Sequence, residues 1–363
     1  MDHKNLSLIG FGTGGIHARI ENRDLLGQAV ETALKCGYNF IDTAEVYGDG
    51  SSELAVGAAV KGMDRESVFI ATKFSPEHNA PEKMRTALKQ SLARLRTDYV
   101  DLYQMHWPNP EVPFEETLAA LRQFKREGTI KNIGLCNLSY SELKKAIDFL
   151  GDDLFSLQME YNLADRYVER DILPLCRANN VRFIAYYPLN RGKKLSKAGD
   201  ARLSEITARS GISLPQLMLS WLIAKGVMPI PGSMNQAHIQ DNIKAERIRL
   251  TDCDIEVLES IYPYDIKMIK PGDIRPIGSN SRQHNTYMNL SEAMDNIYNN
   301  APSPKELSKV VEIEADKINP IRVVKDNEGY YLAEGKIRYW AWVIAFGWER
   351  PLPCIIRQNE EDM

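Results

Sequence analysis

Short hydrophobic runs alternate with longer amphipathic segments from the N-terminus to about residue 245. The runs are rich in apolar and β-branched residues, which predicts buried strands, and the segments between them have the spacing of helices. In the segment 113–128, for example, Phe114, Leu118 and Leu121 share one helical face, and Gly128 is a natural end. The predicted strands lie at residues 8–13, 40–44, 68–74, 100–107, 132–137, 156–162, 182–188 and 227–233.

This alternation predicts a closed barrel. Strands that alternate with helices form parallel βα units. Eight units within about 240 residues match the size of a (β/α)8 barrel better than that of an open sheet. We therefore expect an α/β protein whose main domain, residues 1–262, is a (β/α)8 TIM barrel.

The pattern changes after the barrel. Residues 263–307 are expected to be a loop or linker that covers the barrel mouth. Within and just before this segment, residues 262–285 are rich in Pro, Gly, Asn and Ser, and a short helix is expected at 290–298. Residues 308–363 have a hydrophobic pattern of their own and predict a small α+β domain. Within it, we expect strands at 310–315 and 321–326.

Composition narrows the class of protein. The chain has 363 residues, of which 44% are hydrophobic and 26% charged, enough for a sizeable core. A net charge of -4 argues against binding nucleic acid through bulk positive charge. Since no run approaches the roughly 18 apolar residues of a membrane helix, and the first residues lack an apolar stretch, we expect neither a membrane span nor a signal peptide.

The five cysteines are far apart and include no Cys-x-x-Cys pair. This argues against a disulfide framework or a zinc ribbon and favours a reducing cytoplasm. We expect no metal site. Nothing in the sequence indicates the oligomeric state.

Candidate chemistry lies where the predicted strands end, because catalytic residues of such barrels follow their strands. Asp42, Lys73 and His106 end the second, third and fourth strands, and Tyr47 lies just beyond the second. A tyrosine, with a pKa of about 10, is a poor acid unless a nearby ammonium favours its phenolate. A carboxylate keeps that lysine charged, and a histidine can orient a carbonyl. The set suits protonation of a carbonyl oxygen while another group supplies hydride.

Eight sequence blocks carry a resemblance to a known family; they lie at 9–15, 40–48, 69–74, 101–108, 133–139, 158–162, 185–189 and 230–242. Through them the chain resembles, over about residues 5–262, the aldo-keto reductase family. The resemblance implies an NAD(P)H-dependent oxidoreductase that interconverts a small-molecule aldehyde or ketone, with sugar-like carbonyls among the candidates, and an alcohol. It implies that Tyr47 is the general acid, that Lys73 and Asp42 tune it, and that His106 orients the substrate carbonyl.

The resemblance also implies a cofactor site. Asn137 and Gln158 are similar to the pair that binds the nicotinamide carboxamide, and Tyr186 to the tyrosine that stacks on the ring. Trp107 is a candidate wall of the substrate pocket, with core packing as the alternative. The other implied cofactor contacts are Gly12, Thr13, Pro188, Leu189, Gly232, Ser233, Met234, Asn235, His238, Asp241 and Asn242.

Two positions depart from the family pattern. Cys136 stands where the family usually has Ser, which weakens one expected hydrogen bond to the carboxamide. Met234 and His238 stand where many NADP-preferring members carry Lys or Arg, the residues that bind the 2′-phosphate. We expect NADP as the cofactor, with NAD as the alternative.

Two further alternatives stay open. The tail resembles, more weakly, the ParB/sulfiredoxin-like domain, in which a segment like Gly335–Arg338 holds phosphate; alternatively, Trp340, Trp342 and Trp348 simply bury apolar area in a packing domain. For the whole chain, the alternative to an enzyme is a non-catalytic cofactor-binding regulatory or scaffold protein. The intact set of Asp42, Tyr47, Lys73 and His106 favours the enzyme.

Overall fold

The computed structural model describes residues 6–15, 19–192, 197–261, 266–276, 287–298, 302–313, 315, 318 and 320–357. The chain divides into two compact units, of which the second consists mainly of the chain from Ile261 onward. Within the described ranges, no helix is both long enough and apolar enough to cross a membrane.

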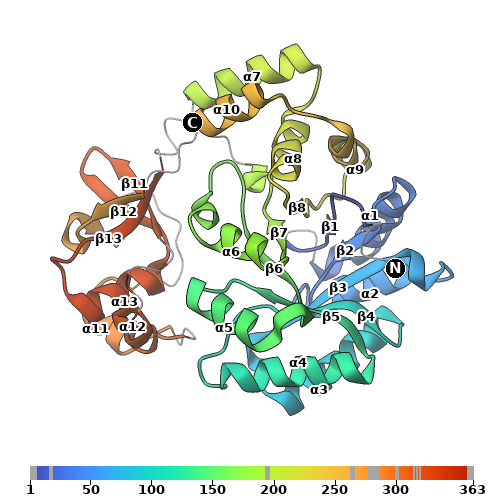
Figure 1. Ribbon diagram of the computed structural model, residues 1–363, viewed down its shortest axis with the longest axis horizontal. Coiled ribbons are helices and arrows are strands. Elements are labelled where there is room, and N and C mark those ends of the chain that lie inside the picture. The colour runs from blue at the N-terminus through green and yellow to red at the C-terminus, as the bar shows by residue number, and fades with distance from the viewer. Residues whose placement is uncertain are drawn as a thin grey trace. The chain divides into compact units, whose positions relative to one another are not determined.

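The first unit is a barrel of eight strands that pair in chain order (Figure 1). The neighbouring strands are parallel throughout. The first and last strands of the sheet meet and close the barrel. Gly10 N donates to Pro229 O at 2.9 Å, and Gly12 N donates to Pro231 O at 3.1 Å. The predicted (β/α)8 barrel is therefore confirmed. Its strands are β1 Phe11–Gly12, β2 Phe40–Asp42, β3 Phe69–Phe74, β4 Val100–Met105, β5 Ile130–Cys136, β6 Leu154–Glu160, β7 Arg182–Tyr186 and β8 Met228–Pro229.

The helices cover the outside of this sheet (Figure 1). In α4, Leu118, Leu121 and Phe124 are buried, and Gly128, with a φ of 79°, ends the helix as expected. The α-helices of this unit are α1 Arg23–Lys35, α2 Ser51–Ala59, α3 Pro81–Leu95, α4 Phe114–Glu127, α5 Tyr140–Leu150, α6 Ile172–Ala178, α7 Lys197–Ser210, α8 Leu214–Ala224, α9 Gln236–Asn242 and α10 Asp252–Ile261. Short 3₁₀ turns include η4 Arg65–Ser67 and η5 Pro76–His78.

The interior of the barrel changes from apolar to polar toward the carboxyl ends of its strands. Phe40, Ala71 and Leu102 belong to a buried cluster in which Phe40 stacks on Phe69 with ring centroids 5.0 Å apart. Because side chains two residues apart share a face, the next inward positions are Asp42, Lys73 and Gln104. The strand pattern thus brings a polar layer to the mouth of the barrel. The apolar cluster also contains Ile184, Met228 and Ile230.

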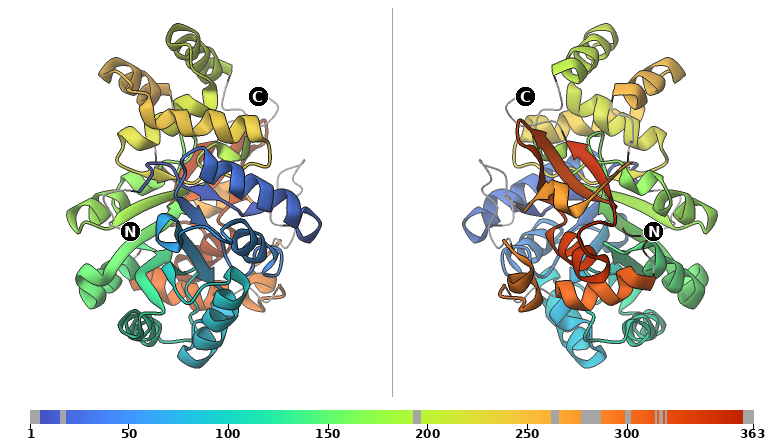
Figure 2. Two further views of the ribbon diagram at one scale, coloured as in Figure 1. Left: turned by 90° about the vertical axis from the view of Figure 1, so that its right-hand side faces the viewer. Right: turned by 90° about the vertical axis from the view of Figure 1, so that its left-hand side faces the viewer.

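The second unit is built on a five-stranded sheet of order β10-β12-β11-β13-β9. Figure 2 shows its helices α12 and α13 side by side next to the sheet. Its elements are β9 Ile266–Ile269, β10 Ile274–Arg275, α11 Leu290–Met294, α12 Pro304–Ile313, β11 Ile321–Asp326, β12 Gly329–Glu334, α13 Lys336–Phe346 and β13 Leu352–Arg357.

The segment 263–307 differs from the expected loop. It contributes two strands, β9 and β10, to the sheet of the second unit, whereas the short helix expected at 290–298 is present as α11. Tyr339 ties this segment to α13, since the single hydrogen of its hydroxyl is shared between Pro271 O and Ile274 O, each 3.1 Å away. Residues 277–286 of the expected loop lie outside the described residues. The covering of the barrel mouth by this segment stays a prediction.

The strand expected at 310–315 is wrong, because α12 runs through Ile313. Its start is a capping box: Ser303 N donates to Glu306 Oε2 at 2.8 Å, and Glu306 N donates back to Ser303 Oγ at 3.2 Å. Pro304 occupies the first helical position, where its missing N–H costs nothing. This local start overrides the β-branched composition of the segment.

Candidate active site

Four predicted catalytic residues form one connected group at the carboxyl ends of the strands. Asp42 ends β2 and forms a buried ion pair with Lys73 on β3. The Lys73 ammonium also donates to the Tyr47 hydroxyl oxygen at 3.4 Å and to Thr43 O at 3.0 Å. The ring of His106, directly after β4, meets the Tyr47 ring edge-on, with centroids 5.7 Å apart. The structure therefore brings together four side chains that span 64 positions of the sequence.

The surroundings of Tyr47 act on its pKa in opposite directions. Burial raises the pKa of the phenol, whereas the positive charge of Lys73 lowers it, and the net effect is a raised pKa. Burial would lower the pKa of Lys73, but the charge of Asp42 outweighs this and raises it. At neutral pH, Tyr47 therefore carries its proton beside a permanently charged ammonium.

His106 is uncharged at neutral pH. Burial first, and the neighbouring charge of Lys73 second, lower its pKa from 6.5 to about 3. A neutral imidazole has one N–H donor and one acceptor nitrogen. His106 can thus offer a hydrogen bond to a carbonyl oxygen without competing with Tyr47 as the acid.

Gln104 and Gln158 complete the polar layer around Asp42. The Nε2 of Gln158 donates to Asp42 Oδ2 at 2.8 Å, and the Nε2 of Gln104 donates to the same oxygen at 3.2 Å. Because a carboxylate only accepts, both amides must point their nitrogen toward it. The Oε1 of Gln104 accepts from Cys136 Sγ at 3.9 Å. This arrangement leaves Gln158 Oε1 as an acceptor for a ligand amide.

Asn137 and Tyr186 extend the connected group to β5 and β7. The Asn137 Nδ2 donates to His106 O at 3.0 Å, and its Oδ1 accepts from the Tyr186 hydroxyl at 2.9 Å. Asn137 has a φ of 59°, in the left-handed region that asparagine tolerates better than most residues. These contacts hold the two predicted nicotinamide contacts in place at the end of the barrel strands.

The glycine-rich segment at the end of β1 permits two close approaches. A Cβ at Gly12 would lie 2.7 Å from Ile230 O, and one at Gly14 would lie 2.9 Å from the Tyr47 ring. Thr13 is fully buried, and its hydroxyl donates to Asp42 O at 2.9 Å. The segment therefore makes room for Tyr47, and the hydroxyl of Thr13 supports β2.

The predicted phosphate and adenosine contacts lie after β8, and no described contact joins them to Tyr47 or Lys73. Their residues from Gly232 to His238 are exposed or half-buried, whereas Asn242 is buried. The carboxylate of Asp241 accepts from Ser213 Oγ at 2.7 Å and Gln216 Nε2 at 2.9 Å, so it stabilises the start of α8. Pro188 is buried and Leu189 half-buried, directly after β7.

Trp107 is 49% exposed, so it is not a core residue. Its backbone oxygen accepts from Asn79 Nδ2 at 3.2 Å, which anchors the loop after β4 to the loop after β3. An exposed aromatic ring next to His106 suits the wall of a pocket for a small substrate.

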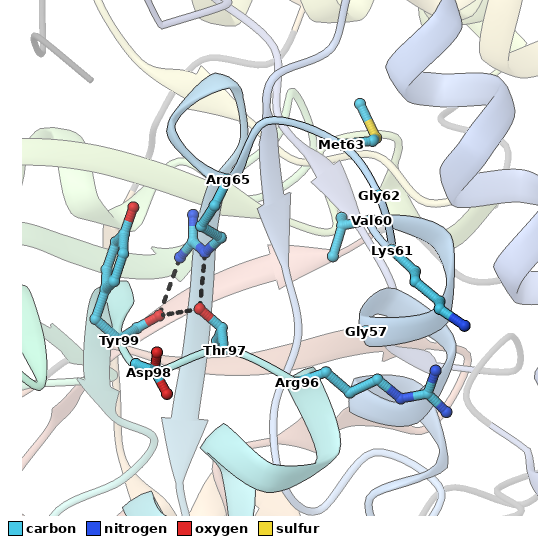
Figure 3. A pocket seen from close by; sticks show the side chains of 10 residues that line it. All are labelled: Gly57, Val60, Lys61, Gly62, Met63, Arg65, Arg96, Thr97, Asp98 and Tyr99. Carbon is cyan, nitrogen blue, oxygen red and sulfur yellow. Dashed lines mark hydrogen bonds between the residues drawn. The ribbon is translucent and has the colours of Figure 1, made fainter.

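A hollow of about 420 Å³ lies at the opposite, amino-terminal ends of β3 and β4 (Figure 3). Arg65 lines it but uses its guanidinium within the chain, donating to Thr97 Oγ1 at 2.9 Å and Tyr99 O at 3.1 Å. Lys61, Arg96 and Asp98 place charges of both signs around the opening. Catalytic groups of such barrels collect at the other end, and the connected group of Tyr47 lies there.

Comparison with known proteins places the barrel in a family. The model of the Aldo/keto reductase family matches residues 8–263. This agrees with the resemblance expected for residues 5–262. The family model ends at residue 263, so it leaves almost all of the chain after Ile261 unmatched.

Individual relatives agree with this match. Methylglyoxal reductase YeaE of Escherichia coli is 34% identical over 263 residues, which cover 71% of this chain and 92% of that protein. An NADH-specific methylglyoxal reductase of Escherichia coli is 29% identical over 310 residues, covering 70% of this chain and 94% of that protein. An aldo-keto reductase from Klebsiella pneumoniae, solved in complex with NADPH, shares 32% identity and a TM-score of 0.66, covering 71% of this chain and 92% of that one.

Proposed function

Because the chain belongs to the aldo/keto reductase family, we propose that it reduces small 2-oxoaldehydes such as methylglyoxal, with NADPH as the reductant. The broader activity is that of a nicotinamide-dependent oxidoreductase that interconverts a carbonyl compound and an alcohol. The names of the relatives support the substrate class, and the NADPH complex from Klebsiella pneumoniae supports the cofactor. NADH stays the alternative, since one relative is specific for it.

The observation that carries the proposal is the hydrogen bond from Lys73 Nζ to the Tyr47 hydroxyl oxygen. Because Lys73 donates to this oxygen, the hydroxyl hydrogen remains available for a substrate carbonyl. As the carbonyl becomes an alkoxide, Tyr47 transfers this proton to its oxygen, and the phenolate that remains is stabilised by the ammonium. Asp42 keeps Lys73 charged throughout.

His106 orients the substrate in this scheme. Its neutral imidazole donates one hydrogen bond to the carbonyl oxygen and polarises the bond without giving up a proton. Two donors, Tyr47 after β2 and His106 after β4, thus converge on one oxygen from either side of β3. Trp107 limits the space on the solvent side.

The residues present fit a nicotinamide cofactor. Gln158 retains Oε1 as an acceptor for a carboxamide N–H, and the ring of Tyr186 lies half-buried at the end of β7. The residues after β8 from Gly232 to His238 are open to a phosphate and adenosine group. When bound, the cofactor supplies hydride to the carbonyl carbon.

The competing function is that of a non-catalytic cofactor-binding protein. Such a protein would have no need of a proton donor held beside a buried lysine. The complete set of Asp42, Tyr47, Lys73 and His106, together with the buried ion pair, therefore favours the enzyme.

The test is the loss of absorbance at 340 nm when the full chain is mixed with NADPH or NADH and a carbonyl compound. We expect turnover with methylglyoxal, and weaker turnover with glyceraldehyde, a sugar-like carbonyl. Cofactor binding without turnover of any compound in the panel would favour the regulatory protein.

For the second unit we propose a packing role. Trp340 and Trp342 are buried, and their indole N–H groups donate to Tyr287 O at 3.1 Å and Arg350 O at 2.9 Å. Trp348, by contrast, is 41% exposed. Arg338 donates to Pro320 O at 2.9 Å, so part of its guanidinium supports the start of β11. A rise in the melting temperature of the full chain with ATP, abolished by Arg338→Ala, would instead favour the ParB/sulfiredoxin-like phosphate site.

A further inference from the structure

A buried carboxylate stands between two of the catalytic loops. Glu45 follows β2 and precedes Tyr47 by two residues, and only 8% of it is exposed. Its Oε1 accepts two hydrogen bonds, from Ser75 N at 2.6 Å and from His78 Nδ1 at 2.7 Å. Both donors belong to the loop after β3, which follows Lys73. Burying a carboxylate is costly unless donors satisfy it, so this contact requires an explanation.

The contact joins the strands that carry the proton donor and its ammonium. Glu45 also uses its backbone, because its N donates to Lys73 O at 3.1 Å. Tyr47 is two residues from Glu45, and Lys73 is two residues from Ser75. The hydrogen bond between Glu45 and Ser75 therefore links the backbone at Tyr47 to the backbone at Lys73. The spacing of their side chains depends on this link as well as on their own hydrogen bond.

The connection continues to the loop after β4. The Nδ2 of Asn109 donates to Pro76 O at 2.9 Å, and the Nδ2 of Asn79 donates to Trp107 O at 3.2 Å. Three loops, which follow β2, β3 and β4, are thus joined by side-chain hydrogen bonds through the turn Pro76–His78. The hydrogen bond between Glu45 and His78 joins the loop after β2 to the loop after β3.

We propose that Glu45 and His78 are a positioning pair, which sets the placement of Tyr47 relative to Lys73 and to the pocket wall at Trp107. Neither residue needs to touch substrate or cofactor for this role. A misplacement of a reacting group by about 1 Å can lower a rate by roughly 10²-fold, so a shift of the loop affects turnover more than cofactor binding. The inference rests on the proposed reductase activity.

Another buried carboxylate provides a matched control at the opposite end of β3. Asp101 accepts from Ile70 N at 2.9 Å and from Arg65 Nη2 at 2.6 Å, and it is 5% exposed. Like Glu45, it combines one backbone N–H of the β3 segment with one basic side chain. Its partner Arg65 lines the hollow of Figure 3 at the amino-terminal ends of β3 and β4. Asp101→Asn therefore measures how much the loss of such a contact lowers the stability of the protein at a place away from the catalytic residues.

The experiment compares Glu45→Gln, His78→Ala, the double variant and Asp101→Asn in full-length protein. For Glu45→Gln we expect kcat for methylglyoxal to fall roughly tenfold and its KM to rise, with an unchanged Kd for NADPH. His78→Ala should behave alike, and the double variant should be no worse than Glu45→Gln, because both changes break one contact. Asp101→Asn should lower Tm and leave kcat unchanged.

Two results would overturn the proposal. One is a kcat for Glu45→Gln and His78→Ala equal to that of the wild type. The other is losses that simply multiply in the double variant. If Glu45→Gln does not fold, the kinetics of His78→Ala alone test the proposal. The His78 side chain is 38% exposed, so we expect this variant to fold. A wild-type protein without turnover would refute the proposed function instead, which keeps the two failures apart.

Discussion

Lys73 and Asp42 form an ion pair that is almost completely enclosed, with 0% and 2% of their side chains exposed. Two amide groups, from Gln104 and Gln158, satisfy the second oxygen of the carboxylate. A charged pair at this depth is tolerated because each charge compensates the other. The same pair sustains the charge that acts on Tyr47.

Removing the carboxylate should destabilise the protein. Asp42→Asn leaves the ammonium of Lys73 buried without its counter-charge, and we expect the free energy of unfolding to fall by about 3–5 kcal/mol. Urea denaturation measures this directly. The double variant Asp42→Asn/Lys73→Met should recover part of the loss, because no unpaired charge remains. A double variant less stable than Asp42→Asn would show that the buried charge is not the cause.

The low pKa of His106, about 3 instead of 6.5, predicts a pH dependence of stability. Below pH 6.5 the unfolded chain binds a proton at this residue that the folded protein does not. The stability that uncharged His106 contributes is therefore fully present above pH 6.5 and is lost as the pH falls toward 3. His106→Gln should flatten the decrease in unfolding free energy between about pH 7 and pH 5. An equal decrease in variant and wild type would contradict the low pKa.

Cofactor choice should be readily shifted. Met234, Asn235 and His238 include no lysine or arginine at the expected position of the 2′-phosphate. His238→Arg adds a guanidinium that can bind phosphate through two hydrogen bonds. We expect the ratio of Kd for NADH to Kd for NADPH to rise roughly tenfold, equivalent to about 1.4 kcal/mol. An unchanged ratio would mean that the phosphate binds elsewhere.

Part of this site could be predicted from the sequence because of how a barrel is built. Strand ends meet at one mouth, so Asp42, Lys73 and His106 could be placed together once the strands were identified. Gln104 was missed, although a glutamine within the apolar run of β4 is itself a signal for a buried polar contact. No such signal exists for Glu45 and His78, since their contact depends on how two loops fold against each other.

In the second unit, hydrophobic composition was misleading. The segment 310–315 has the alternation of a strand, yet the capping box at Ser303 and Glu306 begins a helix that includes it. The sequence from Ser303 to Glu306 contained this signal. The strands β9 and β10 were missed for another reason: they are short and pair only with strands formed more than 50 residues later.

Whether Tyr47 delivers the proton can be measured with Tyr47→Phe in a single turnover. Phenylalanine keeps the ring and removes the donor, so the folded site and the Kd for NADPH should be preserved. With enzyme in excess of NADPH and methylglyoxal added at saturation, we expect the rate of loss of absorbance at 340 nm to fall by at least about 10²-fold. A rate close to that of the wild type would contradict the account, because another group would then have to supply the proton.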